Sequence, residues 1–190
     1  TLSTVARTTR AASEVTRMKN PKVSELIYPI MQALDEEYLD VDIQLGGVDQ
    51  RHILAYAREY LPLLKYESRV EVMTPLIVSL RGPGVKMSAS IPESRILVHD
   101  SPEIIKKNII NAYCPAGVAQ DNPILQLTKF IIFAVKNKFK IEREKKFGGN
   151  VVFNSYNDLE KEFVNKKIHP SDLKNALSNE LINIFKKVRD

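Results

Sequence analysis

Long apolar runs are missing from this sequence of 190 residues, and so is a second cysteine. The longest apolar stretch, Phe130 to Val135, is followed at once by Lys136 and falls far short of the roughly 18 residues that a membrane-spanning helix needs. The single Cys114 excludes an internal disulfide, and no Cys or His cluster with zinc-site spacing surrounds it. These absences predict a chain without a membrane span or a protein-bound metal, working in the reducing cytoplasm.

Glycine and proline are also scarce, with seven and ten residues, beside 44% hydrophobic and 27% charged residues. This balance excludes collagen-like repeats and disorder, and the length allows one domain or two small ones. The chain starts at Thr1 with neither an initiator Met nor a charged segment followed by an apolar one. We therefore expect it to be a portion of a longer protein.

The net charge of +5 is unevenly distributed. Residues 1–128 contain 14 Lys and Arg against 15 Asp and Glu, whereas residues 129–190 contain 14 against eight, a net charge of +6. Lys and Arg neutralise phosphates, so this basic block is typical of a polyanion-binding segment. A solvated helical surface with surplus lysines explains the charge equally well.

The first hundred residues alternate between strand and helix patterns. Apolar positions at spacings of three and four predict the first helix, with a local bend at Pro29. The glycine pair Gly46-Gly47 is expected to end a strand, and Asp49 to cap the helix that follows. The predicted order is helix 23–38, strand 41–45, helix 49–60, strand 69–73 and an irregular loop at 81–90. Strands alternating with helices predict a parallel α/β sheet.

After residue 98 the pattern becomes mostly helical. Its predicted helix starts are Ser101-Pro102, Asn122-Pro123, Ser155 with Asp158 as a capping box, and Ser171-Asp172 before an amphipathic run to Lys187.

One polar stripe stands out on the helix at 23–38. Tyr28, Gln32 and Asp35 follow each other at i, i+4 and i+7, so they share one face. An ionised Asp accepts hydrogen bonds, and Gln both donates and accepts them, so the stripe can hold a small polar ligand. The alternative is an ordinary helix edge at the protein surface.

Two further segments have the residue types of a nucleotide site. Two glycines before Asp49 and Gln50 let a ligand approach the backbone, and an acidic side chain there suits ribose hydroxyls, although the spacing is not GxGxxG. Lys86, with Ser88 and Ser90, places one cation and two hydroxyls on a loop that can close over a triphosphate. A surface loop with an incidental lysine is the alternative.

In this order, the segments resemble class I aminoacyl-tRNA synthetases, and among them the archaeal and eukaryotic type of tyrosyl-tRNA synthetase. Lys86-Met-Ser-Ala-Ser90 is similar to the KMSKS signature of the class. Tyr28 to Asp35 and Gly46 to Arg51 are similar to the family's tyrosine and nucleotide segments. The resemblance covers almost the whole chain and continues through residues 112–117, 146–149 and 169–175.

The resemblance implies ATP-dependent activation of tyrosine to tyrosyl-adenylate, followed by transfer to tRNA(Tyr). It implies that Tyr28 and Gln32 hold the amino end of tyrosine with help from Gln50. Asp35 would accept a hydrogen bond from the phenolic hydroxyl, a contact that rejects phenylalanine. Lys86 would stabilise the leaving pyrophosphate, with Ser88 and Ser90 ordering the loop. The implied ATP-binding residues are Gly46, Gly47, Asp49, Lys86 and Met87, with Mg²⁺ accompanying ATP and no protein-ligated metal.

The resemblance also implies a tRNA surface. Arg51 would read the first acceptor base pair with help from Arg10, and Phe147, His169 and Asp172 would meet the anticodon. His169 is open to a simpler interpretation as a helix-start residue. The implied tRNA-binding residues are Arg51, Arg10, Phe147, His169, Asp172 and Lys174.

Two departures from the family pattern concern the catalytic machinery. Ala89 replaces the second lysine of KMSKS, a position where the family tolerates small residues. The HIGH signature is absent, because His52, His99 and His169 all stand in other contexts. We therefore expect the front half of the catalytic domain to lie outside this chain, and the chain to be inactive alone.

The predicted fold is α/β. Residues 1–98 are expected to form the second half of a Rossmann-type parallel-sheet catalytic domain with a KMSKS-type loop at 82–91. Residues 99–190 are expected to form a mostly α-helical anticodon and tRNA-binding domain, and the complete protein is expected to be a homodimer in the cytoplasm. Three alternatives stay open: a tryptophanyl enzyme, a non-catalytic tRNA-binding module that retains the fold, and a structural or signalling protein that uses it as a scaffold.

Overall fold

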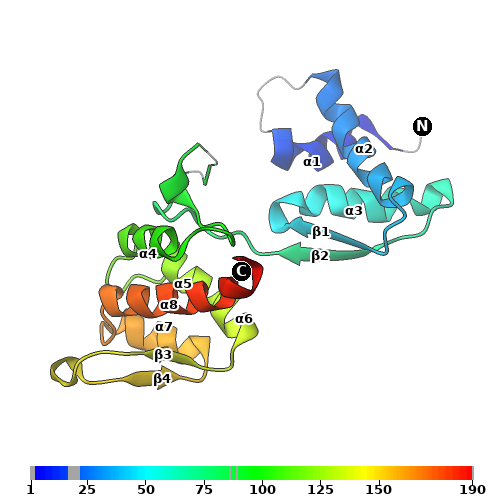
Figure 1. Cartoon of the computed structure of the whole chain (residues 1–190). Helices are drawn as coiled ribbons and strands as arrows, with labels where there is room; N and C mark the ends of the chain where they lie inside the picture. The colour runs from blue at the N-terminus through cyan, green and yellow to red at the C-terminus, as the bar shows by residue number, and fades with distance from the viewer. Residues whose placement is uncertain (1–2, 17–21, 86, 89, 190) are drawn as a thin grey trace. The chain divides into compact units, whose positions relative to one another are not determined.

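The computed structural model describes residues 3–16, 22–85, 87–88 and 90–189. The chain divides into two compact units, Thr1–Leu76 and Ile77–Asp190 (Figure 1). Within the described residues, no helix is long and apolar enough to cross a membrane.

The first unit contains a short parallel sheet, as predicted. Strand β1 pairs with β2 from Ile43 opposite Val70 to Gly47 opposite Thr74. The expectation that the two glycines end the strand is wrong, because both are paired in register with β2, Gly46 with Met73 and Gly47 with Thr74. The elements are α1 (Val5–Thr16), α2 (Val23–Tyr38), β1 (Ile43–Gly47), the 3₁₀ turn η1 (Val48–Gln50), α3 (Arg51–Tyr60), η2 (Pro62–Leu64) and β2 (Val70–Thr74).

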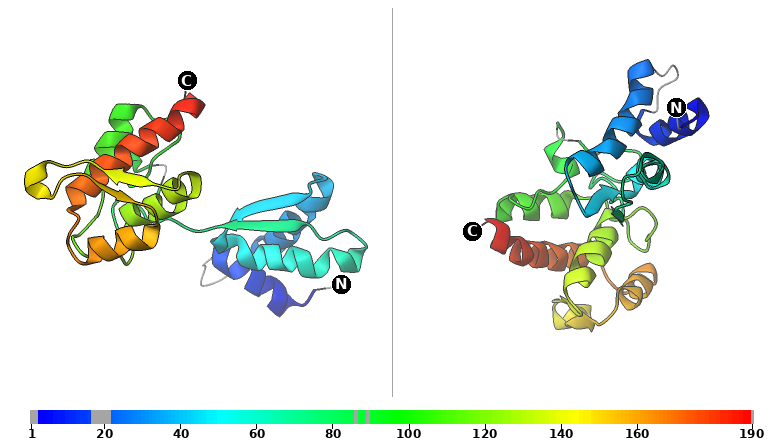
Figure 2. Two further views of the ribbon diagram at one scale, coloured as in Figure 1. Left: turned by 90° about the horizontal axis from the view of Figure 1, so that it is seen from below. Right: turned by 90° about the vertical axis from the view of Figure 1, so that its right-hand side faces the viewer.

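Helices α1, α2 and α3 lie on the same side of the two strands (Figure 2). They pack around a small core that contains Ala11, Ala33, Tyr56, Ala57 and Leu61. The helix predicted over residues 23–38 is confirmed with its predicted bounds, and Glu25 supports its start by accepting a hydrogen bond from the Lys22 backbone N–H at 2.7 Å.

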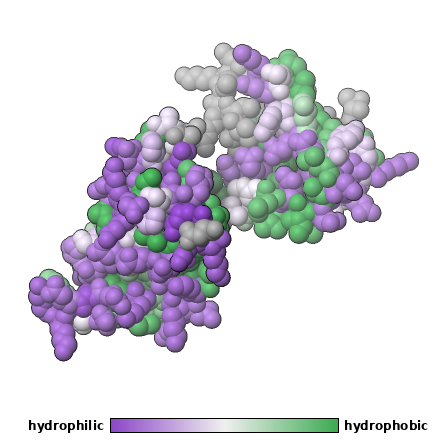
Figure 3. Space-filling view, in the orientation of Figure 1, coloured by the Kyte–Doolittle hydropathy of each residue, from purple (hydrophilic) through white to green (hydrophobic). Residues whose placement is uncertain are grey.

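The other face of the sheet is apolar and exposed. Ile43 and Leu45 of β1 and Val70 and Val72 of β2 share this face, since side chains alternate along a strand. Their exposed fractions run from 43% to 66%. Apolar surface is visible on this unit in Figure 3.

The start of α3 differs from the prediction. Gln50, rather than Asp49, occupies the N-cap position, and Asp49 belongs to the 3₁₀ turn that leads into the helix. The helix ends at Tyr60, as predicted. The Asp49 carboxylate instead lies beside Gly47: a Cβ added to that glycine would be 2.4 Å from Asp49 Oδ1.

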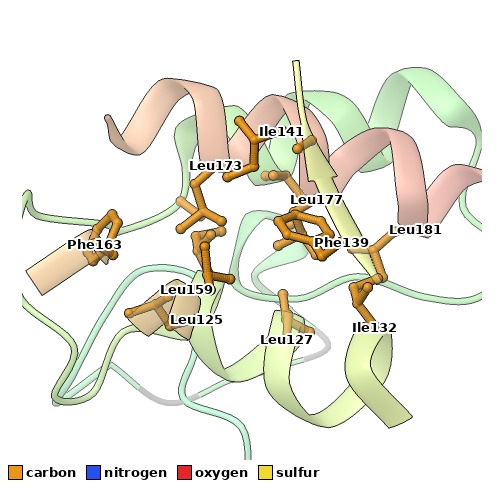
Figure 4. Packing of buried hydrophobic residues seen from close by; sticks show 14 of the residues in the cluster. Leu125, Leu127, Ile132, Phe139, Ile141, Leu159, Phe163, Leu173, Leu177 and Leu181 are labelled. Carbon is orange, nitrogen blue, oxygen red and sulfur yellow. The ribbon is translucent and has the colours of Figure 1, made fainter. Parts of the chain in front are cut away.

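The second unit is mostly helical around one large core (Figure 4). Phe139 and Ile141 from a strand pack there with leucines of two helices, including Leu159, Leu173 and Leu177. The elements are η3 (Pro92–Ser94), α4 (Pro102–Asn111), α5 (Pro123–Leu127), the π-helical η4 (Thr128–Ile132), α6 (Phe133–Val135), β3 (Phe139–Ile141), η5 (Lys145–Phe147), β4 (Val151–Phe153), α7 (Tyr156–Val164) and α8 (Pro170–Arg189).

Three of the predicted helix starts in this unit are confirmed. Ser101, Asn122 and Ser155 are the N-caps of α4, α5 and α7, and each side chain accepts a hydrogen bond from a first-turn backbone N–H. Helix α8 begins at Pro170, one residue earlier than predicted, because proline suits the first helical position. The antiparallel hairpin β3–β4 was not predicted.

Residues 77–98 pack with the helical unit, since Leu80 belongs to its core and the Leu80 backbone N–H donates to the Ser94 carbonyl at 3.0 Å. The compact units therefore divide after Leu76. A functional boundary near residue 98, between a catalytic and a tRNA-binding domain, stays a prediction.

Candidate functional site

The polar stripe predicted on residues 28–35 lies on α2. Tyr28 and Asp35 are exposed, and Gln32 between them is partly buried. Gln32 Nε2 donates to Gln50 Oε1 at 3.4 Å, so this stripe and the start of α3 meet at these two amides. Gln32 Oε1 is buried and has no hydrogen-bond partner among the described residues. Buried polar atoms are normally hydrogen-bonded, so this oxygen is an acceptor that a ligand can satisfy.

The glycine segment after the strand is closely packed against α3. A Cβ on Gly46 would meet Gln50 Cβ and Leu54 Cδ1 at 3.4 Å, and one on Gly47 would collide with Asp49. The two glycines therefore let the Asp49 carboxylate and the aliphatic part of the Gln50 side chain lie against the end of β1. A ligand at this strand end would meet an acceptor-only carboxylate and an amide, which suits hydroxyl groups.

Sequence reasoning missed one buried and one partly buried acid in this unit. Glu36, which follows the polar stripe on α2, is 1% exposed, and Glu71 lies on β2 among outward-facing valines. Glu36 Oε2 and both carboxylate oxygens of Glu71 lack hydrogen-bond partners within the described residues. The sequence carried a signal for Glu71. Side chains alternate along a strand, so Glu71, which stands between Val70 and Val72, lies on the opposite face of β2 from these two valines.

This carboxylate pair, Glu36 and Glu71, has perturbed proton affinity. Removal from water, followed by the charge of Glu36, raises the pKa of Glu71 to about 7, against a smaller opposing effect of Arg58. Burial also raises the pKa of Glu36, and Arg69 acts in the opposite direction. Each carboxyl therefore binds its proton more tightly than an ordinary glutamate does.

The loop similar to KMSKS belongs to the second unit. Its Lys86 and Ala89 lie outside the described residues. Ser88 Oγ and Ser90 Oγ are 2.8 Å apart, and the Ser90 backbone N–H donates to Ser88 Oγ at 3.3 Å. The Met87 side chain is exposed to solvent. In the described part of the loop, the hydroxyls of Ser88 and Ser90 are therefore paired with each other, while Met87 faces outward.

The predicted anticodon residues fall on two turns of the second unit. Phe147 ends the 3₁₀ turn at the hairpin tip, with 60% of its surface exposed and Lys146 Nζ 4.9 Å from the ring centroid. His169 precedes α8, where Nδ1 accepts a hydrogen bond from the Ser171 backbone N–H at 3.2 Å. His169 is thus a helix-start residue, and its ring is exposed.

Arg143, which sequence reasoning did not select, connects these two turns. Its Nε donates to the Gly149 carbonyl at 2.8 Å and its Nη1 to the Lys167 carbonyl at 2.9 Å. Gly148 and Gly149 have positive φ values of 95° and 70°, which favour glycine. The guanidinium fork therefore fixes the hairpin tip beside the segment that leads to His169.

The four other predicted tRNA-binding residues have distinct surroundings. Arg51 is exposed at the first position of α3, and Arg10 is exposed on α1. Lys174 Nζ donates to the Ile110 carbonyl at 3.0 Å, in the last turn of α4, where a cation stabilises the helix end. Asp172 is partly buried in the first turn of α8.

No group of three or more His, Cys, Asp and Glu side chains that could hold a metal occurs within the described part of the chain.

A family model described as tRNA synthetases class I (W and Y) matches residues 1–186. A tyrosine–tRNA ligase from Archaeoglobus fulgidus is 44% identical over 189 residues, which are 99% of this chain and 58% of that protein. The cytoplasmic tyrosine–tRNA ligase of Xenopus laevis is 41% identical over 182 residues, 95% of this chain and 34% of that protein. The chain thus spans between about a third and three fifths of the length of these relatives.

Solved structures show the same likeness. The Archaeoglobus fulgidus tyrosyl-tRNA synthetase complexed with L-tyrosine superposes with a TM-score of 0.84 at 43% identity, over 99% of this chain and 58% of that one. The Pyrococcus horikoshii enzyme complexed with L-tyrosine gives 0.85 at 32% identity, over 98% and 58%. A tryptophanyl-tRNA synthetase from Giardia lamblia gives 0.62 at 16% identity, over 97% and 52%, a likeness of fold alone.

Proposed function

Because the chain belongs to the family of class I tRNA synthetases for tryptophan and tyrosine, we propose that it is a portion of a tyrosine–tRNA ligase. The complete enzyme activates tyrosine with ATP, releases pyrophosphate and transfers the tyrosyl group to tRNA(Tyr). Support comes from relatives at 41% to 44% identity over 95% to 99% of this chain, all tyrosine enzymes. One structural observation supports a small polar substrate above all others. Gln32 Oε1 is buried beside Gln50 and has no hydrogen-bond partner among the described residues.

In this proposal the first unit binds tyrosine. Tyr28, Gln32 and Gln50 hold the amino end, since an ammonium is a donor and Gln32 Oε1 is an acceptor in need of one. Asp35 accepts from the phenolic hydroxyl. Asp35 is exposed in this chain, and in a complete enzyme that covers it the site would reject phenylalanine by about 10⁴-fold or more, because the buried carboxylate would stay unpaired.

The nucleotide contacts are assigned to two further segments of the chain. Gly46 and Gly47 let adenosine approach the end of β1, and Asp49 accepts from the ribose hydroxyls. Lys86 and Met87, with Ser88 and Ser90, serve the triphosphate, where catalysis consists of positioning and charge stabilisation as the tyrosine carboxylate attacks the α-phosphate. Mg²⁺ belongs to the substrate here, because it is usually bound through nucleotide phosphates.

The second unit supplies the tRNA contacts. Its charge favours this role, since residues 129–190 carry a net +6. Phe147 offers an exposed ring on which an unstacked base can lie, and His169 and Asp172 can read its edge. Lys174 adds a positive charge, while Arg51 and Arg10 of the first unit are assigned to the acceptor end. Homodimerisation and a cytoplasmic location also belong to this proposal.

The proposed activity needs a further part of the synthetase fold. The chain has no HIGH signature, and one apolar face of its sheet is exposed in the described residues. Tyrosine-dependent exchange between ATP and pyrophosphate is therefore expected from the chain only after addition of the portion of the Archaeoglobus fulgidus enzyme outside the matched segment. Robust exchange by the isolated chain would contradict this requirement.

Substitution of Asp35 tests the choice of amino acid. In the complemented enzyme, Asp35→Asn is expected to lower the preference for tyrosine over phenylalanine by about 100-fold or more, since the amide no longer demands a hydroxyl donor. Asp42→Asn, which changes an exposed carboxylate outside the stripe, is the matched control. Equal discrimination in both variants would refute the role of Asp35, and exchange driven by tryptophan instead would favour the tryptophanyl alternative.

A further inference from the structure

The loop that contains Ser88 and Ser90 is closed at its base by the core of the second unit. The Leu80 backbone N–H donates to the Ser94 carbonyl at 3.0 Å, and the Tyr113 backbone N–H donates to the Leu80 carbonyl at 2.6 Å. Leu80 itself is buried in the core. The chain therefore leaves the core at Leu80 and returns to it at Ser94, so the intervening loop has fixed ends.

The Ser94 side chain fills the inside of this loop. It is fully buried, at 0% exposure. Its hydroxyl donates to the Ile91 carbonyl at 2.6 Å and accepts from the Ser88 backbone N–H at 3.0 Å. The hydroxyl also lies within donating distance of the Ser88 carbonyl, at 3.2 Å. One oxygen atom thus meets three backbone groups of the loop, and two of them belong to Ser88 of the signature.

Asn108 holds the same turn from the neighbouring helix. It lies on the buried face of α4 between Ile105 and Ile109, with 5% of its surface exposed. Its Nδ2 donates to the Pro92 carbonyl at 3.2 Å and to the Arg95 carbonyl at 3.1 Å, one at each end of the turn η3. An amide on an apolar helix face is costly unless it is hydrogen-bonded, and here both of its N–H donors are used.

We propose that Ser94 and Asn108 are positioning residues for Ser88 and Ser90 of the signature loop. This inference rests on the proposed synthetase function. Ser94 fixes the backbone at Ser88, and Asn108 fixes the turn that contains Ser94, so α4 determines where the Ser88 and Ser90 hydroxyls lie. Neither side chain is placed in contact with substrate, and their effect is on the geometry of the loop at the moment when pyrophosphate leaves.

Amide hydrogen exchange on the 190-residue chain tests the structural half of this proposal without any activity. In Ser94→Ala, the Ser88 amide loses its acceptor, and its exchange rate is expected to rise about tenfold, the effect of losing roughly one hydrogen bond. Asn108→Leu is expected to accelerate exchange of the Ser88 and Ser94 amides together. The control is Ser178→Ala, since Ser178 is also fully buried and its hydroxyl donates to the Asn175 carbonyl of its own helix, away from the loop.

Kinetics of the complemented enzyme test the functional half. Ser94→Ala is expected to reduce kcat for tyrosine-dependent pyrophosphate exchange by between about tenfold and 100-fold, because misplaced loop groups act on the transition state. The KM for tyrosine is expected to stay within about twofold of the unsubstituted enzyme's value, since the residues proposed to bind tyrosine belong to the other unit. Ser178→Ala is expected to change neither constant.

The outcomes separate the two proposals. Unchanged Ser88 exchange in Ser94→Ala overturns the positioning role, whatever the enzyme does. Faster exchange together with an unchanged kcat overturns it as well, because the loop then moves without consequence. If the unsubstituted, complemented enzyme shows no tyrosine-dependent exchange, the proposed function fails, while the amide result still decides whether Ser94 holds the loop. If Asn108→Leu does not fold, Ser94→Ala alone decides, because it removes a single oxygen and keeps Cβ.

Discussion

Replacing Glu71 by Gln tests the carboxylate pair of the first unit. The Glu71 side chain lies on the sheet face that carries Gln44 of β1, and its pKa is raised to about 7 by burial and by the charge of Glu36, against Arg58. Gln has nearly the same volume as Glu but stays neutral at every pH, so Glu71→Gln removes the titration of Glu71, whereas that of Glu36 remains.

The sign of the effect follows from proton binding. Below the ordinary pKa of 4.5, Glu71 is protonated in both folded and unfolded chains, and above about 7 it is ionised in both. Between these values only the folded chain retains the proton, so the free energy of unfolding falls as pH rises. A pKa difference of 2.5 units corresponds to about 3 kcal/mol, an upper value because Glu71 is only partly buried. Glu71→Gln is therefore expected to be more stable than the unsubstituted chain at pH 8, by up to about 3 kcal/mol, with little difference near pH 4.5.

Urea unfolding at several pH values between 5 and 8 measures this difference. The chain has no Trp, and five of its seven Tyr lie in the first unit, so tyrosine fluorescence mainly follows that unit. Glu67→Gln, which alters an exposed carboxylate just before β2, is the control and is expected to retain the pH dependence of the unsubstituted chain. If Glu71→Gln also retains that dependence, the carboxyl at position 71 does not keep its proton near neutral pH and the reasoning fails.

Two further substitutions test the second unit. Arg143→Lys keeps the charge but loses the fork that reaches the Gly149 and Lys167 carbonyls. The Kd for tRNA(Tyr), measured by filter binding, is therefore expected to rise about tenfold with an unchanged salt dependence, whereas the control Lys138→Arg should change neither quantity. An unaltered Kd in Arg143→Lys would contradict the proposed anticodon geometry. Gly82→Ala puts a Cβ 2.8 Å from Tyr113 Cγ at a φ of +96°, and is expected to lower the free energy of unfolding by about 1–3 kcal/mol in urea titrations followed by circular dichroism. In Gly84→Ala, at a φ of +79°, the added Cβ has nothing within 4 Å, so only backbone strain should lower the free energy of unfolding. Equal losses of stability in the two variants would show that the collision with the Tyr113 ring contributes nothing.

Local signals predicted the elements whose cause is local. Ser101, Asn122 and Ser155 start helices because each side chain satisfies a backbone N–H of its own first turn, and this needs no distant partner. The stripe on α2 was also predictable, because helical spacing alone places Tyr28 and Asp35 on one face.

The failures have long-range causes. Gly46 and Gly47 have low strand propensity, yet pairing with Met73 and Thr74, 27 residues further on, keeps them in β1. The strands of the hairpin β3–β4 have three residues each, which is too few to show an alternation of apolar and polar residues. The glycine pair Gly148-Gly149, which has positive φ in the structure, was the one sign of the turn in the sequence. Glu36 and Glu71 become unusual only when the fold buries them near each other, which no pattern of spacing along the chain reveals.

The division of the cores bears on how the proposed chemistry is stabilised. Tyr28, Gln32 and Gln50 belong to the first unit, which also contains the carboxylate pair Glu36 and Glu71, so their geometry is expected to respond to pH through Glu71. The Ser88–Ser90 loop has a different support, because Leu80 and the helix that carries Asn108 belong to the large core that also includes Leu173 of α8. The signature loop and the start of α8, where His169 lies, therefore share one folding unit, although their proposed substrates differ. A destabilising substitution in this large core should impair the loop and the proposed anticodon surface together. Tyrosine recognition, which is assigned to the first unit, should be retained.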